Sequence, residues 1–143
     1  MRIALVVSRY HAFVTDRLEA GARAALVEAG VAPGDVEVFG VPGAFELAQA
    51  AARLAESGSW SAIACLGCLI RGETPHFDYI ADAASHGIMR AAQETGVPMT
   101  FGVLTTNTAD EALARAGDGA ANKGREAALA ALEMARLYRR VSP

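Results

Sequence analysis

Hydrophobic positions along the chain change their period repeatedly, and each change marks a new predicted element. Residues 3–7 form an apolar run that is too short for a helix and rich in β-branched side chains, which predicts a buried strand. Residues 14–29 carry apolar side chains at helical spacing and stop at Gly30, which predicts a helix. The same alternation predicts further strands at 36–41, 62–70 and 99–104, and further helices at 43–56, 74–96, 108–117 and 123–139.

Strands that alternate with helices are typical of a parallel sheet whose crossover helices cover both faces. The predicted fold class is therefore α/β, a flavodoxin-like three-layer sandwich with a four-stranded parallel sheet. A length of 143 residues suits one domain, and we expect a single domain over 1–143. Ligands of such sheets bind beyond the carboxyl ends of the strands, so the candidate site falls in the loops 8–15, 40–46, 71–76 and 105–108.

Composition and charge narrow the classes of function. Hydrophobic residues make up 52% and charged residues 20%, which excludes a disordered chain. Thirteen basic residues face sixteen acidic ones without a basic run, so no nucleic-acid partner is expected. The longest apolar run, 62–70, is half the roughly 20 residues of a membrane span, and the N-terminus lacks the layout of a signal peptide. We expect a cytoplasmic protein with no membrane partner.

The loop before the third predicted helix carries the strongest local signal. Gly72 turns the chain into a helix N-terminus beside the Thr74 hydroxyl, and Pro75 suits the first helical position. Such a turn can hold a phosphate or carboxylate, although Thr74 could simply cap the helix. His76 falls in the first turn, where the helix dipole favours a neutral imidazole that can act as a base; a structural or solvated histidine is the alternative. A P-loop signature is absent, so no nucleoside triphosphate is expected.

Two other loops offer aromatic side chains. Phe45 precedes Glu46, and this pair could stack on a heterocycle and accept its hydrogen bonds. Alternatively, Phe45 belongs to the core and Glu46 complements the helix dipole. Tyr10 raises the same choice in the first loop, where His11 faces either a ligand or solvent.

Cys65 and Cys68 form a Cys-x-x-Cys pair, which suggests a redox centre or half of a zinc site. Their position argues against both, because they lie within a predicted buried strand rather than at a helix N-terminus. Residues three apart on a strand point to opposite faces, and the sequence offers no second cysteine pair or paired histidines. We therefore expect two reduced, buried cysteines and no metal.

Together these segments resemble the lumazine synthase family. The matching stretches run in order over almost the whole chain: SRYH at 8–11, VPGAFE at 41–46, LG at 66–67, IRGET at 70–74, HF at 76–77, FGVLTT at 101–106, RAG at 115–117 and NKG at 122–124. The resemblance implies condensation of 5-amino-6-(D-ribitylamino)uracil with 3,4-dihydroxy-2-butanone 4-phosphate to 6,7-dimethyl-8-ribityllumazine in riboflavin biosynthesis. Phosphate and water are released, and no cofactor is implied.

The resemblance also implies the role of each site residue. His76 transfers protons, and Tyr10 stacks on the pyrimidine ring. The ribitylaminouracil is also contacted by Ala44, Phe45, Glu46, Cys68, Leu69 and Ile70, and by Phe101 of a neighbouring subunit. The phosphate is held by Glu73, Thr74 and a neighbour's Arg115, and Lys123 is a further candidate for the site.

Assembly is implied in the same way: a homo-oligomer, at least a pentamer, with sites at subunit interfaces and riboflavin synthase as a candidate partner. The alanine-rich composition suits such interfaces. Two departures leave a lone pentamer and an icosahedral capsid both open. Gly119 stands where the family often has a lysine near Arg115, and the chain begins at its first strand without the N-terminal extension of many members.

Three other functions compete with this one. The same pocket could bind a flavin or lumazine without turnover, because fold does not fix function. The related riboflavin synthases of the same fold are a nearer rival. The cysteine pair as a redox centre is the third alternative.

Overall fold

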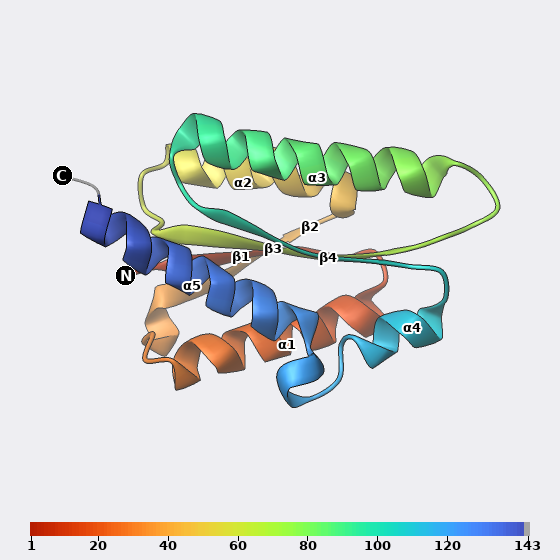
Figure 1. Cartoon of the computed structure of the whole chain (residues 1–143), viewed down its shortest axis with the longest axis horizontal. Coiled ribbons are helices and arrows are strands. Elements are labelled where there is room, and N and C mark those ends of the chain that lie inside the picture. Colours follow the sequence, from red (N-terminus) through yellow and green to blue (C-terminus); the bar gives the residue numbers. More distant parts are fainter. Residues whose placement is uncertain (142–143) are drawn as a thin grey trace.

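The computed structural model describes residues 1–141 and contains a parallel sheet between two layers of helices (Figure 1). Its strands are β1 (Ile3–Ser8), β2 (Val36–Val41), β3 (Ala62–Ile70) and β4 (Met99–Thr106). They lie in the order β2-β1-β3-β4, and every neighbouring pair is parallel. The predicted flavodoxin-like α/β sandwich with four strands is confirmed.

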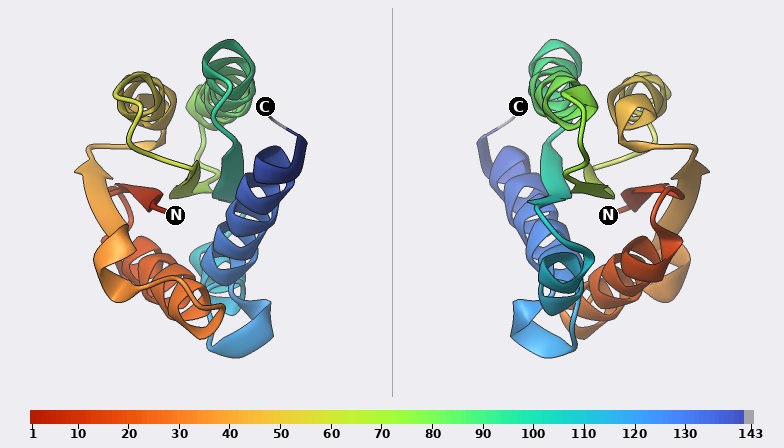
Figure 2. Two further views of the ribbon diagram at one scale, coloured as in Figure 1. Left: turned by 90° about the vertical axis from the view of Figure 1, so that its left-hand side faces the viewer. Right: turned by 90° about the vertical axis from the view of Figure 1, so that its right-hand side faces the viewer.

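Helices cover both faces of the sheet (Figure 2). One layer contains α2 (Leu47–Glu56) and α3 (His76–Thr95). The other contains α1 (Ala12–Glu28), α4 (Ala109–Ala114) and α5 (Lys123–Val141). Short 3-10 turns occur at η1 (Pro33–Asp35), η2 (Ala44–Glu46) and η3 (Gly119–Ala121). None of the helices within 1–141 has the length and hydropathy that crossing a bilayer requires.

The central strands are buried on both faces, which explains their continuous apolar sequence. Along β1, Ile3 and Leu5 join a core cluster shared with α1 and α5, whereas Ala4 and Val6 join a second cluster shared with α2. Strand β2, at the edge of the sheet, is buried only at its two ends. The alternation of side chains along a strand therefore assigns each residue to one of two cores.

Two local predictions need correction. The predicted helix 43–56 is divided, because Gly43 is extended and the Glu46 N–H donates to its carbonyl at 3.2 Å in the tight η2 turn. Thr74 does not cap α3: the N–H groups of Asp78 and Tyr79 donate to the Pro75 carbonyl, at 3.0 and 3.3 Å, so Pro75 is the cap residue just outside the helix.

A side chain caps the start of helix α4. Thr108 stands at the N-cap position in extended conformation, and its hydroxyl accepts a hydrogen bond from the Glu111 N–H at 3.1 Å. Helix α4 therefore begins where a Thr-x-x-Glu pattern predicts that it should.

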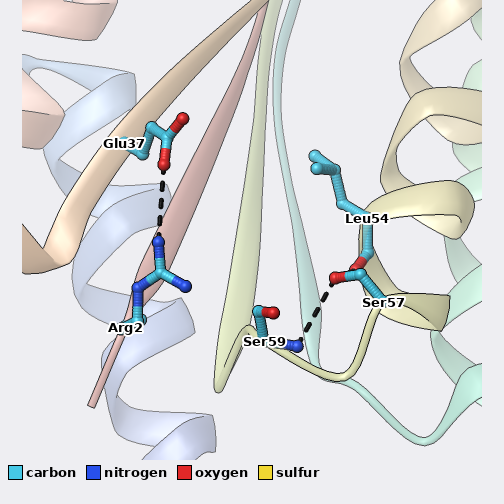
Figure 3. Close-up of polar contacts among 5 residues, drawn as sticks. All are labelled: Arg2, Glu37, Leu54, Ser57 and Ser59. Atoms are coloured by element: carbon cyan, nitrogen blue, oxygen red, sulfur yellow. Dashed lines mark hydrogen bonds and ion pairs between the residues drawn. The ribbon is translucent and has the colours of Figure 1, made fainter.

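Figure 3 shows polar contacts at the end of the sheet where the strands begin. Arg2, just before β1, reaches Glu37 on β2 at 3.4 Å. The Ser57 hydroxyl donates to the Leu54 carbonyl at 2.6 Å and ends α2, while the Ser59 N–H donates to the Ser57 hydroxyl at 3.4 Å. These groups are exposed and each contributes little to stability. They lie at the amino ends of the strands, whereas the strand-to-helix loops lie at the carboxyl ends.

The close approach of α5 to α1 generates a stability prediction. A Cβ on Gly124 would overlap the Leu18 backbone carbonyl, which cannot move away as a side-chain end could. Gly124→Ala should therefore lower the free energy of unfolding by about 1–3 kcal/mol or more. Urea unfolding followed by the fluorescence of Trp60, the sole tryptophan, measures this change. Gly34→Ala is the matched control, because its Cβ meets open space; equal stability of the two variants would contradict the packing argument.

Candidate active site

A cavity of about 890 Å³ lies at the carboxyl ends of β1, β2 and β3. The loops that follow these strands form its walls, on the right-hand side of Figure 1. It gathers most of the residues predicted for the first three loops: Tyr10, Ala44, Phe45, Glu46, Cys68, Leu69, Ile70, Thr74 and His76. Glu73 belongs to the same loop as Thr74 and is exposed, but it does not line the cavity.

Two aromatic rings at the cavity are open to contact. Tyr10 is 66% exposed and Phe45 is 54% exposed, whereas most of the large hydrophobic side chains are at least partly buried. The alternative that Phe45 belongs to the core is therefore wrong. Glu46 is half-buried beside Phe45, so one wall presents a flat ring and a carboxyl group together. Such a wall suits a planar heterocycle with N–H or O–H groups.

The beginning of α3 forms another part of the cavity wall. His76 is the first residue of this 20-residue helix and so lies in the first turn, where the sequence predicts it, although the helix begins two residues later than predicted. Its side chain is exposed at the cavity. Thr74 lines the cavity from the preceding loop and is not used as the helix cap. The first N–H groups of a helix lack acceptors within it and attract anions. A histidine and a hydroxyl thus stand beside a place suited to an anion.

The other predicted residues, Glu73 excepted, lie in a second depression of about 400 Å³, which shares no lining residue with the cavity. It is lined by Phe101 on β4, Arg115 after α4 and Lys123 at the start of α5. The Arg115 guanidinium donates to the Glu111 carbonyl at 3.1 Å, and Lys123 pairs with Glu126 at 3.2 Å. Within one chain, the predicted site residues therefore form two groups.

Several lining residues were not predicted. Phe77 and Tyr79 line the cavity from the first turn of α3, and Glu126 lines the second depression. Helical spacing is a signal that could have identified two of them: Tyr79 stands three residues after His76, and Glu126 stands three after Lys123.

The cysteines behave as buried strand residues. Cys65 packs in the cluster beneath α2, and Cys68 packs in the cluster beneath α1, so they face opposite sides as predicted. Burial raises the pKa of the Cys65 thiol to about 12 and the pKa of the Cys68 thiol to about 11. Both remain protonated at neutral pH, which disfavours a redox centre. No group of three or more histidine, cysteine, aspartate or glutamate side chains within 1–141 could hold a metal ion.

His11 lines the cavity in an unusual conformation. It precedes α1 with φ 63° and ψ 48°, the one non-glycine residue of positive φ in 1–141. Its ring meets the rings of Tyr10 and Phe13 edge to face, with centroids 4.6 and 5.9 Å away. Burial lowers the pKa of His11. Of the two interpretations of this residue, the structure favours a ring that faces the cavity.

This lowered pKa generates a prediction of pH dependence. The unfolded chain binds a proton at His11 more readily than the folded chain, so acidification below the ordinary pKa of 6.5 should cost stability until the folded-state pKa is passed. Because asparagine also adopts positive φ, His11→Asn removes the titration without changing the backbone. Urea midpoints at pH 8 and below pH 6 should show a slightly larger acid loss for the natural chain. A natural chain that gains stability relative to the variant on acidification would contradict this assignment.

Comparisons with known proteins identify the family of the chain. The sequence profile of the family described as 6,7-dimethyl-8-ribityllumazine synthase matches residues 1–139. A relative from Syntrophus aciditrophicus (strain SB), named 6,7-dimethyl-8-ribityllumazine synthase, is 48% identical over 141 residues, which cover 99% of this chain and 92% of the relative. The matched segments include both the cavity and the second depression. This chain belongs to the 6,7-dimethyl-8-ribityllumazine synthase family.

Proposed function

We propose that the chain condenses 5-amino-6-(D-ribitylamino)uracil with 3,4-dihydroxy-2-butanone 4-phosphate to 6,7-dimethyl-8-ribityllumazine, a step of riboflavin biosynthesis. The observation that carries this proposal is the cavity itself. It unites exposed rings, a half-buried carboxyl group, a turn suited to an anion and His76 in a chain that belongs to this enzyme family. The same family membership disfavours a flavin-binding protein without turnover.

The chemistry needs little from the protein beyond placement and proton transfer. The substrate amine attacks the ketone, an imine forms with loss of water, and phosphate leaves. The second amine then closes the ring on the neighbouring carbonyl carbon with loss of a second water. Each step moves a proton, and one step expels an anion. The substrate supplies its own nucleophile, so the protein needs no covalent intermediate. Holding the two reactants side by side accounts for much of the rate.

The heterocycle is proposed to bind between the two aromatic residues of the cavity. Tyr10 stacks on the pyrimidine ring, Phe45 flanks it, and the Glu46 carboxylate accepts its hydrogen bonds. Ala44 completes this wall, and the end of β3 supplies backbone groups at Cys68, Leu69 and Ile70. All seven residues line the cavity, which supports this assignment.

The phosphorylated ketone is proposed to bind next to α3. The backbone at Glu73 and the Thr74 hydroxyl hold the phosphate together with the helix N-terminus, and the Glu73 charge plays no part because that side chain lies outside the cavity. His76, at the same helix end, then lies beside the reacting carbon atoms and transfers protons.

The second depression is proposed to complete the cavity of an adjacent copy. Phe101 would contact the heterocycle there, and Arg115, with Lys123 beside it, would reach the phosphate. A closed ring in which each copy contacts the next head to tail gives one such site at every interface. We propose at least a pentamer in the cytoplasm. Riboflavin synthase, which acts on the lumazine product, is the proposed partner.

Mixing both substrates with the purified protein, without added cofactor, tests the function. Catalytic formation of lumazine, followed by its absorbance and fluorescence, is expected. Product that never exceeds the protein concentration would indicate a binding protein. Consumption of lumazine offered alone would indicate a riboflavin synthase.

His76→Ala should lower kcat by roughly ten- to a thousandfold, because a positioned proton-transfer group contributes ~10²–10⁴-fold and solvent replaces part of it. His86→Ala is the matched control, since His86 is exposed on the same helix, does not line the cavity, and has its Nδ1 atom 2.9 Å from the Asp82 carbonyl oxygen of its own helix. Steady-state kinetics of both variants measure the effect. An unchanged kcat in His76→Ala would remove this residue from the mechanism.

Arg115→Ala should weaken binding of the phosphorylated ketone by roughly ten- to a hundredfold, because a charge-assisted hydrogen bond contributes about 1.5–3 kcal/mol. Affinity for the uracil substrate should be nearly kept. Arg115→Lys should restore only part of the loss, because an ammonium group lacks the planar fork of guanidinium. Separate titrations measure the affinity of each variant for each of the two substrates. A larger loss of affinity for the uracil substrate would contradict the assignment.

Shared sites make activity depend on association. Specific activity should fall when dilution or mild denaturant separates the copies, even where circular dichroism shows that secondary structure is kept. Mass photometry at each concentration gives the size of the assembly. A fully active monomer would overturn the shared-site proposal.

A further inference from the structure

Arg71 lies outside the cavity, yet its side chain joins the segments that hold the cavity's helix. It is the first residue after β3, and its N–H donates to the Thr106 carbonyl at the end of β4 at 2.9 Å. Its Nε donates to the Asn107 side-chain oxygen at 3.2 Å. Its Nη2 atom lies 3.3 Å from an Asp78 carboxylate oxygen, and Nη1 lies 3.5 Å from the other. The same guanidinium carbon lies 4.4 Å from the centre of the Phe77 ring.

Phe77 and Asp78 directly follow His76 in the first turn of α3. Arg71 therefore holds the part of the helix that carries His76, and it anchors that part to two adjacent strand ends. A planar guanidinium can stack on a ring and form two parallel bonds to a carboxylate at once, which an ammonium group cannot do.

The first turn of α3 is less buried than the rest of the helix. The buried residues of α3 are Ala84, Ile88 and Ala91, which begin about two turns beyond His76. In the first turn, His76, Asp78 and Tyr79 are exposed, and Phe77 is half-buried. The preceding loop, 71–75, is exposed throughout. Ile80, one turn after His76, is partly buried and packs against the core cluster beneath α2. The core thus holds α3 from Ile80 onward, while the side chains of the first turn itself make mainly surface contacts.

We propose that Arg71 is a positioning residue that fixes the first turn of α3 and so aims His76 into the cavity. This inference rests on the proposed function for its kinetic consequence only. Misplacing a reacting group by about 1 Å can cost 10²-fold in rate, which is far more than the stability that one exposed ion pair provides. Loss of Arg71 should therefore affect catalysis more than folding.

The test compares Arg71→Met with Arg90→Met, which breaks an exposed ion pair with Glu94 near the other end of α3. Both variants should unfold at nearly the same temperature. Arg71→Met should lower kcat by roughly ten- to a hundredfold while the KM for the uracil substrate stays unchanged, and Arg90→Met should leave kcat unchanged. Arg71→Lys should recover only part of the loss.

A double-mutant cycle separates positioning from a general structural role. Because Arg71 acts through His76, Arg71→Met should lower kcat in the natural chain but not in the His76→Ala background. An equal fold-loss in both backgrounds would overturn the inference. If Arg71→Met fails to fold, Asp78→Asn and Asn107→Ala each remove one contact of the same group, and the same cycle applies to them.

A further measurement does not depend on activity. The N–H groups of Asp78 and Tyr79 close the first turn onto the Pro75 carbonyl, so their hydrogen exchange reports its order. Exchange at these amides should be faster in Arg71→Met and unchanged in Arg90→Met. Unchanged exchange in Arg71→Met would overturn the inference. Absence of turnover in the natural chain together with faster exchange in the variant would instead contradict the proposed function and leave the positioning role intact.

Discussion

Burial of β1 and β3 on both faces is the constraint on which the rest of the structure depends. Neither strand has a polar face that could be exposed to solvent, so helices must cover both sides of the sheet. Strands joined by crossover helices run parallel. The carboxyl ends of parallel strands all lie at the same end of the sheet. The loops after β1, β2 and β3 therefore meet there, and side chains as far apart in sequence as Tyr10 and His76 line one cavity.

The sequence predicts this scaffold well because long apolar runs have few alternatives. The bounds of β2 and β3 agree with the predicted ranges 36–41 and 62–70. Helix starts are less predictable, because one backbone bond decides them. Backbone N–H groups donate to the carbonyls of Pro75 and Gly43, and sequence patterns do not reveal these bonds. For this reason α3 is not capped by Thr74, and the helix expected over 43–56 is divided.

The candidate site was predictable as a set of residues but not as an arrangement. Loop chemistry and the family resemblance named Phe45, His76 and Arg115, whereas their division between two depressions depends on where α4 and α5 cross the sheet. The contacts of Arg71 were also beyond sequence reasoning, because its partner Asn107 stands 36 positions away. The left-handed backbone of His11 carries only a weak sequence signal, because histidine adopts positive φ more often than most residues but far less readily than glycine.

The contacts at the amino ends of the strands have a practical consequence for engineering. The turn between α2 and β3 contains Gly58, with φ 77° and open space around its Cα, and the residues beside it are exposed. This turn lies at the sheet edge opposite the cavity, and exposed turns of small polar residues are where chains best tolerate inserted sequence. A peptide grafted after Gly58 would therefore be displayed at the end of the molecule away from the cavity.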